Sequence, residues 1–424
     1  MKNICFCFLM HVPMQLRRYR FFEIGQDHYY YDDMATEEHL AHLVSVSYMP
    51  LLRALQEMIR LSKGKFHCGL AVTGTSLELM EQYNPELIDI IKELVSSRCL
   101  ELVAMPYAYS LAAQHSETDF EAQLVKHADK LNYLFGVRST TLFNTELLYS
   151  DEIAQLTYRL GYKTILAEGA QHILSYKSPN YVYRSIAAPK QSVLLRNMDL
   201  SDSLAFHFSD TGWPDYPTDA NKFISRLQSL PEEENLINIW MGADAFGIYQ
   251  NAATGIFEFL KALPYYALEN GIGFLTPSEA ARKSKPSDIV SCPYPMTWAG
   301  DSKGLSLFEG NDLQQEALQK LFAVAERVHL CQDQSLKTDW LLLQDANYLH
   351  HMNHQDRGES PFESAYDAFI NYMNILSDFL QLVEEQYPTT IDNEELNALL
   401  KTINNQEKEI LKLQTEIKAL KKKK

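Results

Sequence analysis

The chain has 424 residues, of which 46% are hydrophobic and 11% aromatic, and its formal net charge is −17. A chain of this size and composition can bury a large core, so we expect a folded protein with one large domain and a smaller one. The acidic balance argues against nucleic acid and anionic membranes as partners, because their phosphates would be repelled, whereas neutral ligands such as sugars are unaffected.

Cysteine usage and the amino terminus favour a cytoplasmic protein. Six cysteines are present, only Cys5 and Cys7 lie close together, and no CxxC pair occurs. Neither a disulfide framework nor a zinc site is therefore predicted. The first apolar run is only about seven residues long and lacks the cleavage site of a signal peptide, so we read it as a strand. No run approaches the roughly 18 apolar residues of a membrane span.

Short runs rich in β-forming residues alternate with longer amphipathic stretches along the first two thirds of the chain. Helical stretches are predicted at residues 86–97, 119–134 and 151–160. Repeated βα units favour a parallel sheet, and seven or eight of them favour a barrel. An open doubly wound sheet is the alternative, although no GxGxxG follows any strand. The predicted strands are 4–9, 65–72, 100–104, 139–144, 164–167, 192–196, 236–240 and 272–275.

Composition divides the chain into three parts. Proline and polar residues at 283–288 and 292–295 suggest a linker, and helical patterns follow it at 313–330 and 364–387. We therefore predict an α/β barrel domain over residues 1–285 and an α-helical domain over residues 286–390. Residues 391–424 form a separate tail.

The tail carries a heptad repeat of about four heptads, which predicts a short coiled coil and a possible homo-oligomer through residues 391–424. A single amphipathic helix lying on the body is the alternative reading. The closing lysines are expected to be a solvated end. The two series of core positions are Leu396, Ile403, Ile410 and Ile417, followed three residues later by Leu399, Gln406, Leu413 and Leu420.

The first candidate for catalysis is Glu146. It ends the segment Leu142-Phe143-Asn144-Thr145-Glu146, a short apolar run rich in β-forming residues. In a parallel barrel the loops after the strands form the active-site face, so an acid delivered at a strand's carboxyl end is placed for chemistry.

Several blocks of the sequence together resemble glycoside hydrolase family 57, particularly its α-amylase branch. The block Phe143-Asn144-Thr145-Glu146 is similar to the family region that carries the catalytic nucleophile. The blocks occur in the family's order at residues 11–13 with 17–25, 69–74, 143–146, 241–247 with 254–259, and 298–299 with 310–311. The resemblance implies an incomplete, seven-stranded barrel and a helical domain that closes one side of its cleft. It also implies retaining hydrolysis or glucan transfer on α-glucans such as maltooligosaccharides, without a cofactor or a metal.

The family's catalytic acid is missing from its expected place. It is an aspartate four residues before a Phe-Gly pair, and counting back from Phe246 reaches Gly242. Asp244 stands two residues later, where the family usually has a glutamate. In an extended strand its side chain would face the same side as that of residue 242 but would lie about 6.6 Å further along the strand. A bend at the permissive Gly242 would let Asp244 act as a substitute acid. Without a bend, the acid is lost.

Other positions also depart from the family pattern. They are Val12, Met105, Tyr109, Ser203, His207 and residues 302–304. Loss of polar groups from a site that binds sugar hydroxyls removes orientation and transition-state stabilisation, so these changes together suggest impaired catalysis or a changed ligand.

Three further residues are candidates for substrate binding. His11 ends the first predicted strand, and Trp240 and Trp298 could stack on sugar rings; each could equally be a core residue. His350, His351 and His354 with Asp356 have helical spacing that invites a metal interpretation, but no second set of ligands is evident.

The sequence thus supports two main hypotheses. The first is an α-glucan hydrolase or transferase with Glu146 as nucleophile and Asp244 as a possible acid. The second is a catalytically impaired glucan-binding or assembly protein that oligomerises through its tail. A third, a metal-dependent polysaccharide deacetylase on a related barrel, would have only His11, Asp244 and His115 as candidate ligands.

Overall fold

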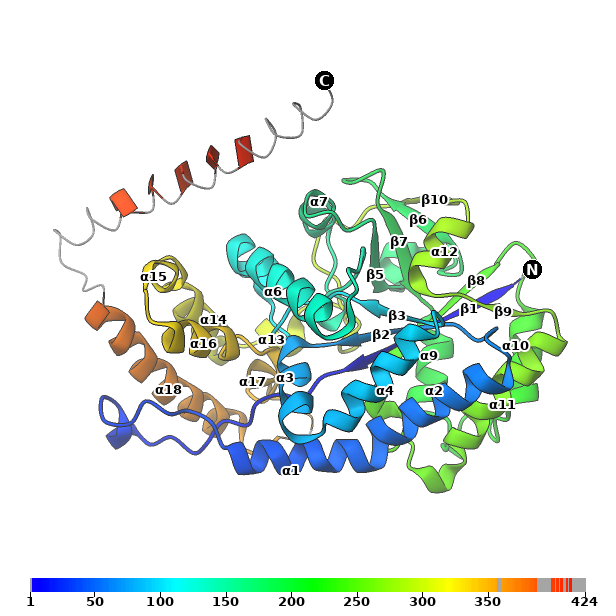
Figure 1. Cartoon of the computed structure of the whole chain (residues 1–424), viewed down its shortest axis with the longest axis horizontal. Coiled ribbons are helices and arrows are strands. Elements are labelled where there is room, and N and C mark those ends of the chain that lie inside the picture. Colours follow the sequence, from blue (N-terminus) through cyan, green and yellow to red (C-terminus); the bar gives the residue numbers. More distant parts are fainter. Residues whose placement is uncertain are drawn as a thin grey trace. The chain divides into compact units, whose positions relative to one another are not determined.

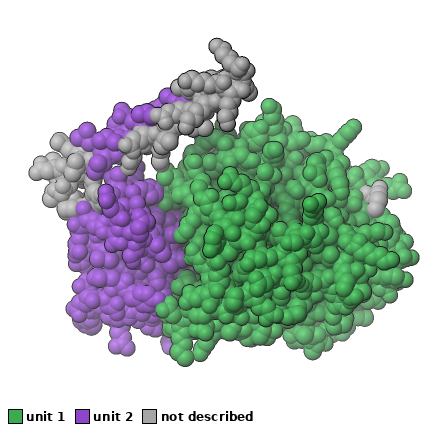
Figure 2. Space-filling model, in the orientation of Figure 1, with its two compact units in different colours: residues 1–15, 32–308, 345–347 green, residues 16–31, 309–344, 348–424 purple. Residues whose placement is uncertain are grey.

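The computed structural model describes residues 2–356, 358 and 360–386, together with some of the residues between 398 and 413. The chain divides into two compact units (Figure 2). Unit 1 comprises residues 1–15, 32–308 and 345–347, and unit 2 comprises residues 16–31, 309–344 and 348–424.

The boundary between the units differs from the predicted one at residue 285. Residues 286–308 belong to unit 1 because they pair with its strands. Met296 forms an antiparallel bridge with Tyr149, and residues 288–290 pair with residues 183–185. The proline-rich composition that suggested a linker reflects irregular backbone packed on the sheet rather than a domain junction.

The first sheet of unit 1 is entirely parallel. Its strand order is β3-β2-β1-β8, and β9 also pairs with β1. Strand β1 is buried along almost its whole length, which explains its uninterrupted apolar sequence. Phe6 and Phe8 stack with their ring centroids 5.8 Å apart within this core. The strands are β1 (Asn3–Met10), β2 (Cys68–Val72), β3 (Leu100–Val103), β8 (Leu236–Gly242) and β9 (Gly273–Phe274).

The second sheet of unit 1 has the order β10-β6-β7-β5-β4. Its pairs are parallel except that β6 runs antiparallel to β7. Strands β6 and β10 were not predicted, since each is short and lies in a polar stretch. The strands are β4 (Thr141–Phe143), β5 (Thr164–Glu168), β6 (Val182–Ser185), β7 (Ser192–Arg196) and β10 (Asp288–Val290).

The two sheets are linked at two places. Ala104, just after β3, forms a parallel bridge with Leu142 of β4. The second link follows β7, where the backbone amide of Asn197 donates to the carbonyl of Asn238 in β8 at 2.8 Å. The parallel pairings within the sheets, together with the parallel bridge between Ala104 and Leu142, bring the carboxyl ends of β1, β4, β5, β7 and β8 to the same side.

Helices of unit 1 cover its strands (Figure 1). Helix α2 contacts both α4 and α11. Ser116 and Ser150 cap the helices that follow them by accepting amide hydrogen bonds. The helices are α1 (Asp33–Leu43), α2 (Met49–Leu61), α3 (Gly74–Tyr83), α4 (Pro85–Ser96), α5 (Ala112–His115), α6 (Glu117–Phe135), α7 (Asp151–Arg159), α8 (Gln171–Leu174), α9 (Met198–Ala205), α10 (Ala220–Ser229), α11 (Ile256–Glu269), α12 (Pro277–Lys283) and α13 (Ser306–Glu309), which reaches residue 309 of unit 2.

Unit 2 is helical in its described part. Residues 16–31 pack on α18, where Asp378 accepts from the amide of Gly25, from His28 and from the hydroxyl of Tyr30. Trp340 stacks on Phe379 in its core. The helices are α14 (Asp312–Phe322), α15 (Ala325–Leu330), α16 (Gln334–Leu342), α17 (Ala346–His350), which begins in unit 1, and α18 (Ala365–Gln386).

The predicted coiled coil falls largely outside the described residues, which exclude 391–397 and 414–424. Those that are described near residues 398–413 are helical. Among them, the apolar side chains Leu399, Ile403, Ile410 and Leu413 are 46–60% exposed. Within the described part of the chain, no helix combines the length and the apolar character needed to cross a bilayer.

Candidate active site

Glu146 lies just beyond the carboxyl end of β4, in a tight turn. The strand ends at Phe143, and residues 145–147 form a short 3-10 turn capped by Asn144. Glu146 has a left-handed backbone, with φ 55° and ψ 24°, which is uncommon for a residue with a side chain. The amide of Trp298 donates to the carbonyl of Glu146 at 2.9 Å and helps hold this conformation. Such local strain is characteristic of functional positions.

The carboxylate of Glu146 is held by two donors. The Tyr109 hydroxyl donates to Oε1 at 2.7 Å, and the indole N–H of Trp298 donates to Oε2 at 2.6 Å. Burial, followed by the charge of Glu146, raises the pKa of Tyr109 well above its ordinary value, so its hydroxyl keeps the proton that it donates. The carboxylate is partly exposed and fixed in orientation.

Trp298 lies between Glu146 and a buried ion cluster. Its ring packs edge-on against Phe143 with centroids 5.4 Å apart, and the Arg196 guanidinium lies 5.5 Å from its centroid. The ring is only partly buried. The sequence led us to expect that Trp298 stacks on a sugar. The structure adds a second role, since its N–H orients the candidate nucleophile.

The ion cluster itself is a part of the site that sequence reasoning missed. Arg196 ends β7 and pairs with Glu168, which ends β5, at 2.9 Å; it also pairs with Asp202 and donates to the carbonyl of Trp240. Burial raises the pKa of Glu168, and the charge of Arg196 opposes that shift. Both Glu168 and Arg196 are buried, so they pair with each other inside unit 1 and have almost no surface for contact with a ligand. The sequence did contain a pattern that could have revealed Glu168 and Arg196, because each is a charged residue at the end of an apolar run.

Asp244 follows the end of β8, next to the position that the sequence assigned to the missing acid. Strand β8 ends at Gly242, and residues 243–245 turn into a 3-10 helix, so the backbone bends. A Cβ atom built on Gly242 would lie 2.1 Å from Oδ1 of Asp244. Within an aspartate the Cβ and Oδ atoms are about 2.4 Å apart, from two bonds of roughly 1.5 and 1.25 Å. The Cγ and Oδ2 atoms of Asp244 lie farther from that Cβ, at 3.1 and 3.5 Å, so only Oδ1 overlaps the space of a carboxylate attached at position 242. The bend thus reduces the displacement expected for an extended strand.

His11 follows β1 and is nearly buried. Its Nδ1 lies 3.0 Å from the Thr73 hydroxyl, and its Nε2 lies 3.0 Å from Oδ2 of Asp345. Its ring stacks on Tyr109 with centroids 4.2 Å apart. Asp345 belongs to a three-residue stretch, 345–347, that returns to unit 1 from the helical region. Nothing in the sequence indicated this residue.

The structure corrects the predicted substrate-binding role of Trp240. Its side chain is fully buried, and its N–H donates to the carbonyl of Cys5 at 3.1 Å. A ring with no exposed surface cannot stack on a sugar, so the predicted binding role of Trp240 is wrong. It packs inside the strands because it points to the inner face of β8, whose residues are almost all buried.

Metal ligands are not gathered anywhere in the described part of the chain: no group of three or more His, Cys, Asp or Glu side chains has suitable geometry there. Nε2 of His350 lies 3.7 Å from Oδ1 of Asp356 in unit 2. His115 is exposed at the end of α5.

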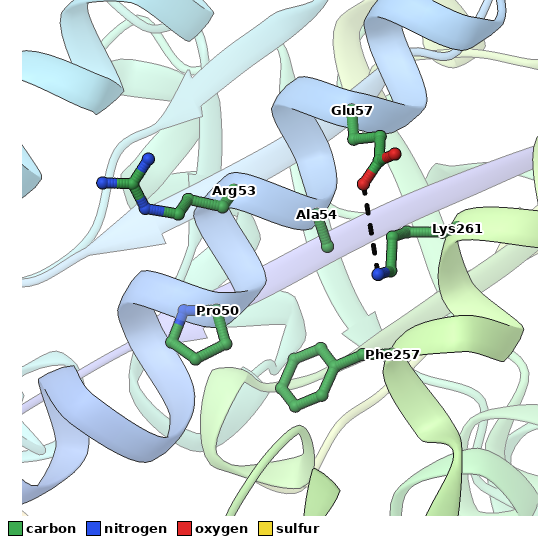
Figure 3. Close-up of a pocket in the computed structure, with 6 residues that line it drawn as sticks. All are labelled: Pro50, Arg53, Ala54, Glu57, Phe257 and Lys261. Atoms are coloured by element: carbon green, nitrogen blue, oxygen red, sulfur yellow. Dashed lines mark ion pairs between the residues drawn. The ribbon is translucent and has the colours of Figure 1, made fainter.

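A shallow groove between α2 and α11 is distinct from the strand ends (Figure 3). Glu57 and Lys261 face each other across it at 4.0 Å. Its remaining lining residues are Pro50, Arg53, Ala54 and Phe257. None of the predicted site residues lines this groove.

Comparison with known proteins identifies the family. The model of glycosyl hydrolase family 57 matches residues 5–293. The chain is 30% identical over 406 residues to a protein of Methanocaldococcus jannaschii named "Putative alpha-amylase", covering 90% of this chain and 85% of that one.

Solved structures share the fold. A branching enzyme of this family from Thermococcus kodakaraensis matches with a TM-score of 0.69 and 13% identity, over 93% of this chain and 94% of that one. A 4-alpha-glucanotransferase from Thermococcus litoralis matches with a TM-score of 0.64 and 15% identity, over 88% of this chain; the chain spans only 60% of that enzyme. At these identities the likeness concerns the fold alone. The family model and the curated relative together establish that this chain belongs to glycosyl hydrolase family 57.

Proposed function

We propose that this protein is a retaining glycoside hydrolase or glucan transferase acting on α-glucans, with Glu146 as nucleophile and Asp244 as acid and base. The observation that carries the proposal is the position of Asp244, whose Oδ1 lies within the reach of a side chain at position 242. The names of the relatives support α-glucans as the substrate class, since they include "Putative alpha-amylase" and a 4-alpha-glucanotransferase.

In the first step, the Glu146 carboxylate attacks the anomeric carbon and forms a covalent glycosyl-enzyme, while Asp244 gives its proton to the departing glycosidic oxygen. In the second step, Asp244 removes a proton from water or from a glucan hydroxyl, which displaces Glu146 and restores the original configuration. Water gives hydrolysis, and a glucan hydroxyl gives transfer.

The donors around Glu146 support this role. Tyr109 and Trp298 each donate to one oxygen of the carboxylate, so its orientation toward a bound sugar is set before the substrate arrives. A carboxylate oxygen has lone pairs beyond the one that accepts a hydrogen bond, so attack at carbon remains possible. We include His11 and Trp298 in the proposal as residues that contact the substrate.

The finer architecture is part of the proposal. The pairings and the two links between the sheets support a closed barrel of seven parallel strands in the order β1-β2-β3-β4-β5-β7-β8. The cytoplasmic setting is supported by six cysteines that are all buried as free thiols.

A second candidate function is a catalytically impaired glucan-binding or assembly protein. The exposed apolar residues Leu399, Ile403, Ile410 and Leu413 favour an assembly role, because their heptad spacing suits pairing with a second copy of the tail. This role is compatible with catalysis. A loss of oligomers after removal of residues 391–424, measured by light scattering, supports the assembly role; unchanged mass contradicts it.

The test of the enzymatic proposal is product formation from maltoheptaose, followed by chromatography. We expect shorter or longer maltooligosaccharides with the parent protein and a loss of at least about 10³-fold in Glu146→Gln and in Asp244→Asn. Glu152→Gln is the matched control, since Glu152 is exposed on α7. Binding of maltoheptaose without turnover by the parent protein would support the impaired alternative instead.

A further inference from the structure

We propose that Asp345 is a positioning residue for Glu146: it fixes which nitrogen of His11 carries the proton and thereby holds the Tyr109 hydroxyl on the carboxylate. The catalytic consequence rests on the proposed function. The structural part, a fixed tautomer of His11, stands on the contacts of the described residues alone.

A chain of donors leads to one nitrogen of His11. The amide of Val12 donates to the Ser76 hydroxyl oxygen at 2.7 Å, and the hydroxyls of Ser76 and Thr73 lie 2.6 Å apart. Thr73 in turn lies 3.0 Å from Nδ1 of His11. The Ser76 oxygen accepts from Val12, and in the proposed order its proton points at Thr73. The Thr73 oxygen also accepts from the amide of Ser76 and from the hydroxyl of Thr75, each at 3.3 Å, and in the proposed order its own proton points at His11.

This order makes Nδ1 the acceptor and leaves the ring proton on Nε2. Nε2 faces Oδ2 of Asp345 at 3.0 Å, and both side chains are nearly buried, at 8% and 5% exposed. The N–H direction falls outside good hydrogen-bond geometry, so Nε2 has no well-formed hydrogen bond and the attraction is chiefly electrostatic. A carboxylate at this distance favours the tautomer that directs its proton toward it.

The orientation of Asp345 is itself fixed. Its Oδ1 accepts from the backbone amide of Asn347 at 2.9 Å and from the Asn347 side-chain amide at 2.8 Å. Two donors on Oδ1 leave Oδ2 as the oxygen that faces His11. The arrangement resembles the general case in which a carboxylate sets the tautomer of a neighbouring imidazole.

The same stretch also holds Tyr109. The amide of Ala346 donates to the Tyr109 carbonyl at 3.1 Å, and Ser110 forms an antiparallel bridge with Asp345. The Tyr109 ring then stacks on His11 at an angle of 18°. Backbone and ring are thus both set by residues 345–346, and the Tyr109 hydroxyl is placed on Oε1 of Glu146 as a result.

The variant Asp345→Asn separates this account from a merely structural role. Asn has the same shape, and its amide oxygen is retained by the two donors of Asn347. Its NH₂ group must then face Nε2 of His11. Two donors cannot share that contact, so the proton of His11 is expected to move to Nδ1 and the hydroxyl chain through Thr73 to reverse.

The experiment uses the full chain labelled with ¹⁵N-histidine, and NMR at pH 8.5, where imidazoles in general are neutral. His11→Gln identifies the resonances of His11 by their loss. We expect the Nε2-protonated tautomer in the parent protein and in the control Asp129→Asn, whose substituted side chain is exposed on α6, and the Nδ1-protonated tautomer in Asp345→Asn. The same proteins are assayed on maltoheptaose, where Asp345→Asn should lower kcat by about 10- to 100-fold and change KM by less than about threefold.

The tautomer of His11, measured in the parent protein and in Asp345→Asn, tests the structural part of the proposal whatever the activity of these proteins. An Nδ1-protonated or doubly protonated His11 in the parent, or the same tautomer in Asp345→Asn, overturns the inference. An active parent whose kcat is unchanged in Asp345→Asn overturns the positioning role. An inactive parent whose tautomer switches in Asp345→Asn supports the inference and refutes the proposed function.

Discussion

Addition of one methyl group at Gly242 tests whether Asp244 has taken over the missing acid. In Gly242→Ala the new Cβ would lie 2.1 Å from Oδ1 of Asp244, whereas non-bonded carbon and oxygen atoms need roughly 3.2 Å. The carboxylate must therefore move by about 1 Å. Net charge and the identity of the acid are unchanged, so any loss reports placement alone.

The expected effect follows from that displacement. A misplacement of about 1 Å in a catalytic group can lower the rate by about 10²-fold, so we expect kcat on maltoheptaose to fall by 10- to 100-fold in Gly242→Ala. Gly304→Ala is the matched control, because the nearest atom to its added Cβ lies at an ordinary contact distance of 3.7 Å. An unchanged kcat in Gly242→Ala, with the carboxylate displaced, would refute the role of Asp244.

Restoration of the family's aspartate gives a contrasting result. If the acid were simply lost from an intact cleft, Gly242→Asp would create activity. The structure predicts that Gly242→Asp lowers activity and stability, because two carboxylates about 3.5 Å apart repel by roughly 5 kcal/mol at an effective dielectric of 20. The double variant Gly242→Asp with Asp244→Ala should recover both. Higher activity in the single variant than in the parent would contradict this reasoning.

Three further predictions concern other groups. Tyr109→Phe removes one donor to Glu146 and should lower kcat by about 10²-fold, measured on maltoheptaose; an unchanged kcat would show that the hydrogen bond does not matter. Burial lowers the pKa of His127 from 6.5 to about 4. As the pH falls, the unfolded chain therefore takes up a proton on this residue before the folded protein does. The free energy of unfolding should decline by about 2 kcal/mol between pH 6.5 and 5. Urea denaturation should show this decline in the parent and not in His127→Gln; equal slopes would contradict it. Burial raises the pKa of Asp339 to about 6, so its ionised form is unfavourable in the folded state above that pH. Asp339→Asn should therefore raise the free energy of unfolding at pH 8 by about 1–2 kcal/mol, a gain that should vanish near pH 4; an equal gain at both pH values would contradict the assignment.

Much of unit 1 could be predicted because its strands are buried on both faces and read as apolar runs. Every predicted strand overlaps one in the structure, and Glu146 was found because a charged residue after such a run is conspicuous. Strands β6 and β10 were missed because they are short, polar and paired at the edge of the sheet.

The rest of the site depended on geometry that no local pattern encodes. The side-chain position expected for Asp244 assumed an extended strand, in which every second residue faces the same side. The backbone instead turns at residues 243–245. Asp345 lies far from His11 in sequence and meets it only through folding of the stretch 345–347. Trp240 illustrates the opposite error: a large aromatic residue near a strand end suggested binding, while its neighbours bury it completely.

The central claim, that Glu146 and Asp244 act as nucleophile and acid, is tested most directly by azide rescue of Asp244→Ala. With α-maltosyl fluoride, whose leaving group needs no proton, this variant should still form the glycosyl-enzyme on Glu146. Azide needs no base, so it should release the sugar as a glycosyl azide of retained α configuration, identified by NMR. Absence of any azide product, or a β-glycosyl azide from Asp244→Ala, would contradict the account.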